Sequence, residues 1–287
     1  MKDPTFSCGK IYLMVYDKEG KNYFICNSVA VLKEDETERT IYDADMSDQG
    51  SYLLVSSSGQ HLSVISVYNR SFNLRATLSF DRYPQKALLS EDGDRLLFLS
   101  YGTNDAGAIE GHVGFFDLSG QTTEKTADHV YDSVPLACVL NGRGAAVLFA
   151  DRVIFYDPNG AERSTFDMTG KTPRAFALSD AHLALLFEGN DVLAENSVTV
   201  FDAETGRTVR SLSFTGRVKG LWMKNGTLFI GENETLHLID PESGRERPYA
   251  CPLPADVIFA EDALFLCYTN KAENIYTMLD FEKDGSS

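Results

Sequence analysis

One pattern of apolar and polar positions recurs along the whole chain. Alternating β-branched and aromatic residues are followed by Asp or Asn, and then by a short turn that is usually closed by Gly. The alternation predicts a β-strand, and an Asp or Asn side chain before Gly is typical of the turn that ends a strand. We name this Asp or Asn the anchor of each repeat. The seven anchors are Asp17, Asn69, Asp117, Asp157, Asp202, Asp240 and Asp280.

The spacing of the anchors predicts the fold class. Successive anchors are 52, 48, 40, 45, 38 and 40 residues apart, and a propeller blade of four strands takes about 40–50 residues. No segment keeps a helical period, so little helix is expected. The sequence therefore predicts an all-β chain, a β-propeller of four-stranded blades with about seven blades.

The strands between two anchors follow a fixed order. An outer strand such as 73–80 comes after the anchor turn, and an inner strand such as 85–90 comes next. A tight polar turn over 90–94 then leads to a strongly apolar second strand over 95–100, and the anchor strand is the third. The continuous apolar run of the second strand favours a sheet that is covered on both faces.

The N-terminal repeat is predicted to be incomplete. Seven anchor strands are found but only six inner and six outer strands, because the chain starts in an anchor strand over 11–17. We predict six complete repeats and a partial N-terminal one, within a single propeller domain over residues 1–287. Either the terminal strands join in one composite blade, or upstream sequence is missing, and we favour missing sequence.

The charge balance argues against two classes of partner. The chain has 26 Lys and Arg against 42 Asp and Glu, a formal net charge of −16. Binding to nucleic acid needs basic faces, as does adhesion to an anionic bilayer. No apolar run of about 20 residues and no signal peptide is present. We expect a soluble monomer that contacts neither nucleic acid nor membrane.

The residues that carry chemistry form no catalytic motif. The nucleophile elbow, the P-loop and the metalloprotease helix are absent. His182 and His237 lie within predicted strands, where a structural role is expected. The five cysteines occur singly, without the spacing of a zinc site. We therefore predict no catalytic residue, no metal site and no cofactor.

One segment superficially matches a calcium loop. It begins with Asp43 and Asp45, but Asp48 stands where Gly is needed and Leu54 occupies the twelfth position, which requires a bidentate carboxylate. The segment is therefore interpreted as the entry to an inner strand.

Three loops between second and third strands are longer than the others. They cover 102–111, 188–196 and 269–274, and such loops share one face of a propeller. A cation or a polar ligand could bind to this acidic rim, although solvated loops of drifting length are the plainer interpretation. The candidate residues are Asn104, Asp105, Glu110, Glu188, Asn190, Asp191, Glu195 and Glu273.

The order of the motifs resembles a known family. The segments DADMSDQGSYLLV, SVYNRSFNLRATLSF and SEDGDRLLFLSYGTNDAGAIEGHVGFFDLSG, with the later anchors, span roughly Asp43 to Tyr268. They are similar to a bacterial, clostridial-type propeller family of unknown function. Its turns are shared with WD-repeat, YVTN and quinoprotein-like propellers. The segment FDAETGRTV resembles the quinoprotein repeat, but the docking Trp that follows in that repeat is absent.

The resemblance implies an N-terminal membrane helix and an earlier first blade, both of which this chain lacks. It also implies a parent protein that is tethered to a membrane with the propeller at the cell surface. The single cysteines favour a cytoplasmic location instead, and we expect the cell surface. The family has no assigned activity, so no catalytic residue is implied.

The sequence is compatible with three functions. The first is a non-catalytic module that binds a protein or a cell-surface partner. The alternative is a sensor that binds a ligand or cation at the acidic rim. A propeller enzyme such as a lactonase or lyase is third, because the inner strands begin with residues that coordinate no metal, apart from Asp45 and Asp256. The others are Lys86, Pro135, Arg174 and Lys219.

Overall fold

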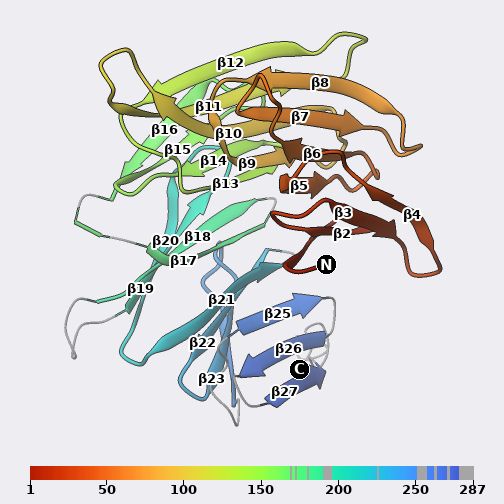
Figure 1. Ribbon diagram of the computed structural model, residues 1–287. Coiled ribbons are helices and arrows are strands. Elements are labelled where there is room, and N and C mark those ends of the chain that lie inside the picture. The colour runs from red at the N-terminus through yellow and green to blue at the C-terminus, as the bar shows by residue number, and fades with distance from the viewer. Residues whose placement is uncertain are drawn as a thin grey trace. The chain divides into compact units, whose positions relative to one another are not determined.

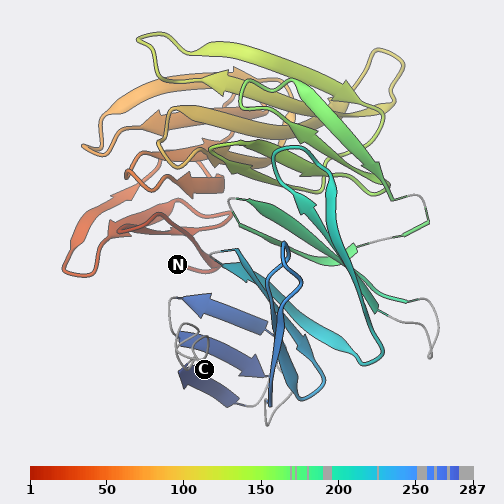
Figure 2. The same ribbon diagram turned by 180° about the vertical axis from the view of Figure 1, so that it is seen from behind.

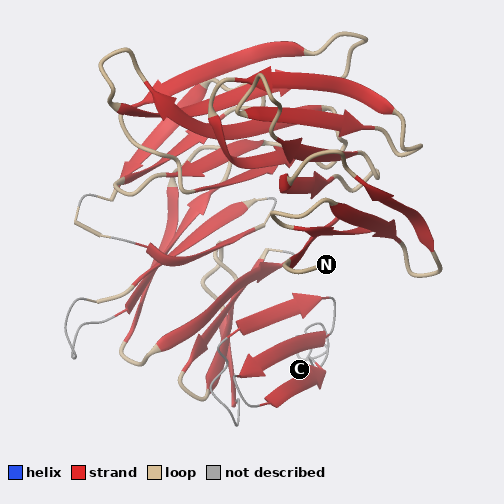
Figure 3. Cartoon of the chain, viewed as in Figure 1, coloured by secondary structure: helices blue, strands red, loops and turns tan. Residues whose placement is uncertain are grey.

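The chain forms strands and loops, and none of the residues described below is helical (Figure 3). The computed structural model describes residues 1–168, 170–171, 173–179, 181–189, 196–224 and 226–250, without the side chain at 178, and the backbone of 257–261, 264–269 and 272–277. Within these residues no helix is long and apolar enough to cross a membrane. Two compact units are present, Met1–Asp167 (unit 1) and Met168–Ser287 (unit 2).

Unit 1 contains four antiparallel sheets, each with four strands in chain order (Figure 1). The first sheet contains β1 (Pro4–Cys8), β2 (Leu13–Asp17), β3 (Asn22–Cys26) and β4 (Val31–Glu36). The second contains β5 (Ile41–Met46), β6 (Tyr52–Ser56), β7 (Ser63–Tyr68) and β8 (Leu74–Phe80). The third contains β9 (Tyr83–Leu89), β10 (Arg95–Thr103), β11 (Ile109–Asp117) and β12 (Glu124–Tyr131). The fourth contains β13 (Ala137–Asn141), β14 (Gly144–Leu148), β15 (Arg152–Tyr156) and β16 (Glu162–Asp167).

Unit 2 contains three further sheets of the same antiparallel type. The fifth contains β17 (Pro173–Leu178), β18 (His182–Phe187), β19 (Asn196–Asp202) and β20 (Thr208–Phe214). The sixth contains β21 (Val218–Lys224), β22 (Thr227–Glu232), β23 (Thr235–Ile239) and β24 (Glu246–Ala250). The seventh, over its described residues, contains β25 (Val257–Glu261), β26 (Leu264–Thr269) and β27 (Ala272–Thr277).

The sheets of each unit meet along their first strands. In unit 1, β5 contacts both β1 and β9, and β9 contacts β13 (Figures 1 and 2). In unit 2, β21 contacts both β17 and β25. Successive sheets therefore pack side by side along their first strands, as the blades of a propeller do.

The apolar side chains of a central sheet are buried on both faces. On β10, Leu96 and Phe98 pack in a cluster with the second sheet, whereas Leu97 and Leu99 pack in a cluster with the fourth. This arrangement confirms the prediction drawn from the continuous apolar run of the second strand. It also explains why that run shows no alternation of polar and apolar residues.

The predicted turns are present where the anchors end third strands. Asp157 Oδ1 accepts hydrogen bonds from the amides of Asn159 (2.8 Å) and Ala161 (2.9 Å), and Asn69, Asp117, Asp202 and Asp240 bond to following amides in the same way. The polar turn over 90–94 is closed by Gly93, whose φ of 75° favours glycine. Asp280 lies outside the described residues.

The prediction for the N-terminal repeat is wrong in its strand assignment. Residues 11–17 do not form a third strand, because β2 is the second strand of a complete four-stranded sheet. The Asp17 carboxylate accepts the amides of Lys2 (2.7 Å) and Asp3 (2.8 Å) instead of ending a turn, and these bonds lower the pKa of Asp17. The first sheet has its anchor at Asn27, which is 42 residues before Asn69 and therefore fits the repeat.

The N-terminal strands were assigned wrongly because the sequences of β1 and β4 show no strong apolar pattern. Phe6 on β1 is 69% exposed, and β4 has the sequence VLKEDE with five exposed positions out of six. The strands are held by their ladders with β2 and β3 rather than by burial of their side chains.

The Asn27 side chain closes the turn between β3 and β4. Asn27 Oδ1 accepts the amides of Val29 and Ala30, both at 2.9 Å. We expect Asn27→Ala to destabilise unit 1 by about 1 kcal/mol, because two amides lose their acceptor. Urea denaturation followed by circular dichroism measures this change. The same loss in Asn22→Ala, a matched substitution at the start of the same strand, would argue against an anchor at Asn27.

Candidate binding face

The strand ends on one side of the four sheets of unit 1 form a common rim, which we call edge A. At edge A the first and third strands begin and the second and fourth strands end, because each sheet is antiparallel in chain order. The loops between second and third strands and the loops between sheets therefore lie there together. Long or aromatic-rich loops on a rigid sheet scaffold are common places for function.

A pocket of about 550 Å³ opens at edge A and is lined by residues of the first, second and third sheets. Tyr83 and Tyr101 form one wall, with ring centroids 5.4 Å apart and ring planes 23° apart. The volume lies within the usual range of ligand pockets. Its lining comprises Lys18, Glu19, Tyr42, Ser57, Ser58, His61, Leu62, Tyr83, Pro84, Gln85 and Tyr101.

The position of the tyrosine pair follows from strand register. Tyr83 is the first residue of β9 and lies directly opposite Tyr101 on β10, so the two rings form a cross-strand pair. The register shifts by one residue between Leu99 and Ser100, which is a bulge close to this edge. Bulges redirect side chains at the rims of sheets. Tyr83 remains 51% exposed.

Large apolar side chains remain exposed along edge A. Six of them, from three of the four sheets of unit 1, are between 36% and 59% exposed. Seven others are exposed elsewhere in unit 1, all but Leu74 in or beside the first sheet, so edge A is distinguished by its stacked tyrosines rather than by the number of exposed apolar side chains. The six are Tyr42, Leu62, Tyr83, Ile109, Val130 and Leu136.

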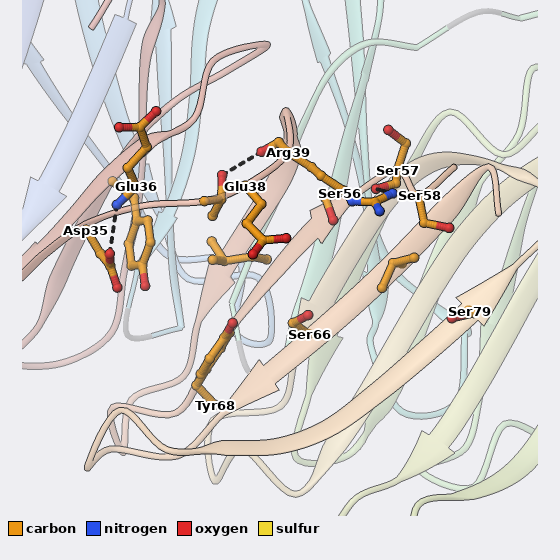
Figure 4. Close-up of a pocket in the computed structure, with 14 residues that line it drawn as sticks. Asp35, Glu36, Glu38, Arg39, Ser56, Ser57, Ser58, Ser66, Tyr68 and Ser79 are labelled. Atoms are coloured by element: carbon orange, nitrogen blue, oxygen red, sulfur yellow. Dashed lines mark hydrogen bonds between the residues drawn. The ribbon is translucent and has the colours of Figure 1, made fainter. Parts of the chain in front are cut away.

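A second depression continues from this pocket between the first and second sheets (Figure 4). We call it the groove. It has a volume of about 530 Å³ and shares Ser57 and Ser58 with the pocket at edge A. Its lining comprises Tyr23, Asp35, Glu36, Thr37, Glu38, Arg39, Leu54, Ser56, Ser57, Ser58, Val64, Ser66, Tyr68 and Ser79.

A cluster of charged groups lies where β5 meets β9. Asp43 Oδ1 lies 2.8 Å from Lys86 Nζ, and Asp43 Oδ2 accepts the amide of Ala87 at 2.9 Å. Asp45 Oδ2 accepts the amide of Leu89 at 2.8 Å, while its Oδ1 accepts the hydroxyl of Ser7 at 2.8 Å. Both carboxylates thus connect the first strands of neighbouring sheets.

This cluster shifts the pKa of several of its groups. Burial raises the pKa of Asp45 to about 6, against the lowering effect of the Leu89 amide. Burial and then the Asp43 carboxylate raise the pKa of Tyr16 to about 12. Burial lowers the pKa of Lys86, but Asp43 and Asp45 outweigh it and raise the value. Because neither carboxylate lines the pocket or the groove, we interpret the cluster as structural.

Half of the predicted loop over 102–111 is strand. Residues 102–103 end β10 and 109–111 begin β11, which leaves a short hairpin tip at edge A. Asn104 Oδ1 accepts the amides of Ala106 and Ala108, and its Nδ2 donates to Glu110 Oε1 at 2.8 Å. Two of the candidate side chains are thus bonded to the tip itself, while Asp105 is exposed.

The other candidate residues belong to unit 2. Glu188 follows β18 and forms an ion pair with Arg174 at 2.9 Å. Glu273 lies within β27, not in a loop, and its side chain is outside the described residues. Asn190, Asp191 and Glu195 also lie outside the described residues. In the described part of the chain no three His, Cys, Asp or Glu side chains could together hold a metal ion.

The two strand histidines are bonded within unit 2. His182 is buried, with its Nε2 at 2.9 Å from Glu242 Oε1. His237 lies between Glu246 Oε1 (2.6 Å from Nδ1) and Glu232 Oε2 (3.2 Å from Nε2). Each bond joins neighbouring strands or turns, in keeping with the structural role expected from their place in strands.

Sequence reasoning missed the tyrosines of edge A. Tyr42 and Tyr83 are the second and first residues of successive first strands, and the repeat pattern assigned both to the connections before those strands. A tyrosine near the start of the first strand in two consecutive repeats was the available signal. Tyr101 carried none, because it continues an apolar run.

Solved structures with this arrangement of strands are β-propellers. The propeller domain of the trilobed protease from Pyrococcus furiosus superposes with a TM-score of 0.59 at 12% identity, over 98% of this chain and 96% of that chain. Hydrazine synthase from Kuenenia stuttgartiensis gives 0.58 at 12% identity, over 95% and 94%. KlHsv2 with loop 6CD replaced by a Gly-Ser linker gives 0.60 at 12% identity, over 92% and 87%. The chain has the β-propeller fold.

Residues 1–252 match the family described as "Family of unknown function (DUF5711)", and the chain belongs to that family. No curated protein matches the sequence significantly. The predicted resemblance to a propeller family of unknown function is thus confirmed at that level, whereas the clostridial type and the membrane anchor stay predictions.

Proposed function

We propose that this propeller is a non-catalytic module that docks a protein partner on edge A of unit 1. The observation that carries the proposal is the stacked pair of Tyr83 and Tyr101 at a solvent-open pocket of about 550 Å³. Tyrosine is enriched at the centres of protein interfaces, because its ring buries a large area at a small cost in side-chain entropy.

The composition of the pocket favours a protein partner over a metabolite. Its polar groups come from two Ser side chains and from one Gln, one His, one Lys and one Glu, and Tyr42 and Leu62 extend the apolar surface beyond the tyrosine pair. A surface of aromatic anchors surrounded by polar side chains is the usual anatomy of a protein interface. The expected location of such an interaction is the outer surface of a cell, as part of a membrane-tethered parent.

The sensor hypothesis remains a second prediction. It rests on the acidic rim, of which Asp105 is the exposed member in unit 1. Among the described residues, no hydrogen bond or ion pair favours this function over docking at edge A. Calcium titration of the full chain by calorimetry, compared with the Asp105→Ala variant, separates the two functions.

The docking proposal predicts that Tyr83→Ala weakens partner binding by at least tenfold. Removing a central aromatic anchor commonly costs about 2 kcal/mol of binding free energy. The full chain is added to cells or extracts and crosslinked to the proteins that it contacts, which gives the candidate partners. The affinity of each purified candidate is then measured by surface plasmon resonance.

The matched control is Leu74→Ala. Leu74 is 57% exposed, close to the 51% of Tyr83, but it begins β8 at the opposite edge of unit 1. A candidate whose affinity falls with Tyr83→Ala and not with Leu74→Ala supports the proposal. Candidates that lose affinity with Leu74→Ala alone, or turnover of a substrate by the purified chain, would refute it.

A further inference from the structure

The second sheet of unit 1 has two unlike faces. Toward the third sheet it presents Val55, Ile65 and Val67, which are fully buried in one apolar cluster. Toward the first sheet, the end near edge A presents Ser56, Ser66 and Ser79. The groove lies over this serine-lined end.

Register explains the position of the groove. Val64 on β7 pairs with Ser56 on β6 and with Ser79 on β8, so small polar side chains flank it on both sides. On β6, Leu54 is buried in the apolar cluster that includes the first sheet, and the next side chain on that face, Ser56, lines the groove. Protein interiors are close-packed, so two sheets that diverge over short hydroxyl side chains leave space that a ligand can fill.

The other wall of the groove is acidic. It is formed by the end of β4 and the loop that follows, from Asp35 to Arg39 (Figure 4). Asp35 is paired with Lys33 at 3.0 Å, and the Arg39 guanidinium donates to the carbonyl of Ser57 at 3.1 Å. Among the described residues, Glu36 and Glu38 have no ion-pair partner.

We propose that the groove binds an extended segment of the partner that carries Lys or Arg side chains. The cationic groups lie at Glu36 and Glu38, and an apolar stem packs against the half-buried ring of Tyr68, which lines the same groove. Cations are attracted both to carboxylates and to aromatic faces. The inference rests on the proposed function, since Ser57 and Ser58 join the groove to the pocket at edge A.

The test uses a fluorescein-labelled nonapeptide with three arginines separated by Gly and Ser. Its control is the same peptide with citrulline in place of arginine, which has the same shape and no charge. Fluorescence anisotropy with the full chain at 0.15 M salt gives the dissociation constants, because this salt screens distant charges. We expect saturable binding of the arginine peptide and at least tenfold weaker binding of the citrulline peptide.

Two double variants separate the groove from the general acidity of the chain. Glu36→Gln/Glu38→Gln removes two charges from the groove and should weaken binding of the arginine peptide about tenfold. Glu34→Gln/Glu124→Gln removes two exposed charges that do not line the groove, and the constant should change less than twofold. Equal losses in the two variants would overturn the proposal.

A third variant fills the groove without changing its charge. Ser66→Phe places a ring against Leu54, the cross-strand partner of Ser66, and should abolish peptide binding while the thermal midpoint stays the same or rises. Peptide binding that survives Ser66→Phe, or no binding to the unmodified chain, would refute the inference. If Tyr83→Ala still weakens the protein partner in that case, the proposed function stands; loss of the Tyr83 effect alone would refute that function instead.

Discussion

Asp43→Ala is expected to destabilise unit 1 by about 3 kcal/mol. The substitution removes the acceptor of the Ala87 amide and the partner of the Lys86 ammonium group, and both are held between β5 and β9. The buried Ala87 amide and Tyr16 hydroxyl both lose an acceptor and stay away from water, which costs more than the hydrogen bonds themselves contributed, whereas the Lys86 side chain is 36% exposed. Urea denaturation of the full chain, followed by circular dichroism, measures the free energy of unfolding.

Two further variants make this result specific. Asp105→Ala removes an exposed carboxylate from the hairpin tip and should change stability by less than about 0.5 kcal/mol. Asp43→Ala/Lys86→Met also removes the Lys86 ammonium group that is left without its partner, and should recover part of the lost stability. If Asp43→Ala is as stable as Asp105→Ala, the charged cluster does not hold the two sheets together.

Asp45 is expected to make stability fall as the pH rises from about 4 to 6. Its pKa is raised from the ordinary 3.8 to about 6 in the folded chain. Between these values the folded state keeps a proton that the unfolded state has lost, so protonation favours folding there. A shift of about two pKa units corresponds to roughly 3 kcal/mol.

The comparison with Asp45→Asn isolates this group from the other carboxyls. Asn is nearly isosteric, accepts the Leu89 amide and can donate to the Ser7 hydroxyl oxygen, but it does not titrate. The free energy of unfolding of the variant should therefore rise relative to the unchanged chain by about 2.5 kcal/mol between pH 4 and pH 7. A difference that stays constant over this range would contradict the assignment.

The repeat pattern predicted the fold because its signals are local. Turns anchored by Asp157 or Asp240 need only a side chain and the next few amides, and a second strand such as β18 is apolar along its whole length. The first sheet escaped this reasoning because β4 is almost wholly exposed, and Asp17 occupies a position where the sequence alone resembles an anchor.

The candidate face depends on contacts between repeats, which the sequence does not display. Tyr83 meets Tyr101 through the register of β9 and β10, and the groove exists because Ser66 faces the first sheet whereas Ile65 faces the third. The loops over 188–196 and 102–111 had the stronger sequence signal, through their length and acidity. The acidic residues of these loops were visible in the sequence, but the hydrogen bonds of Asn104 within its own hairpin tip were not.

Hydrogen–deuterium exchange of the full chain, with and without its purified partner, shows whether edge A is the docking surface. We expect the partner to slow exchange at edge A, in the segments that contain Tyr42, Ser57 to Leu62, Tyr83 to Gln85 and Tyr101, and to leave the start of β8 at Leu74 unchanged. Protection confined to the opposite edge of unit 1, with edge A exchanging as in the free chain, would contradict it.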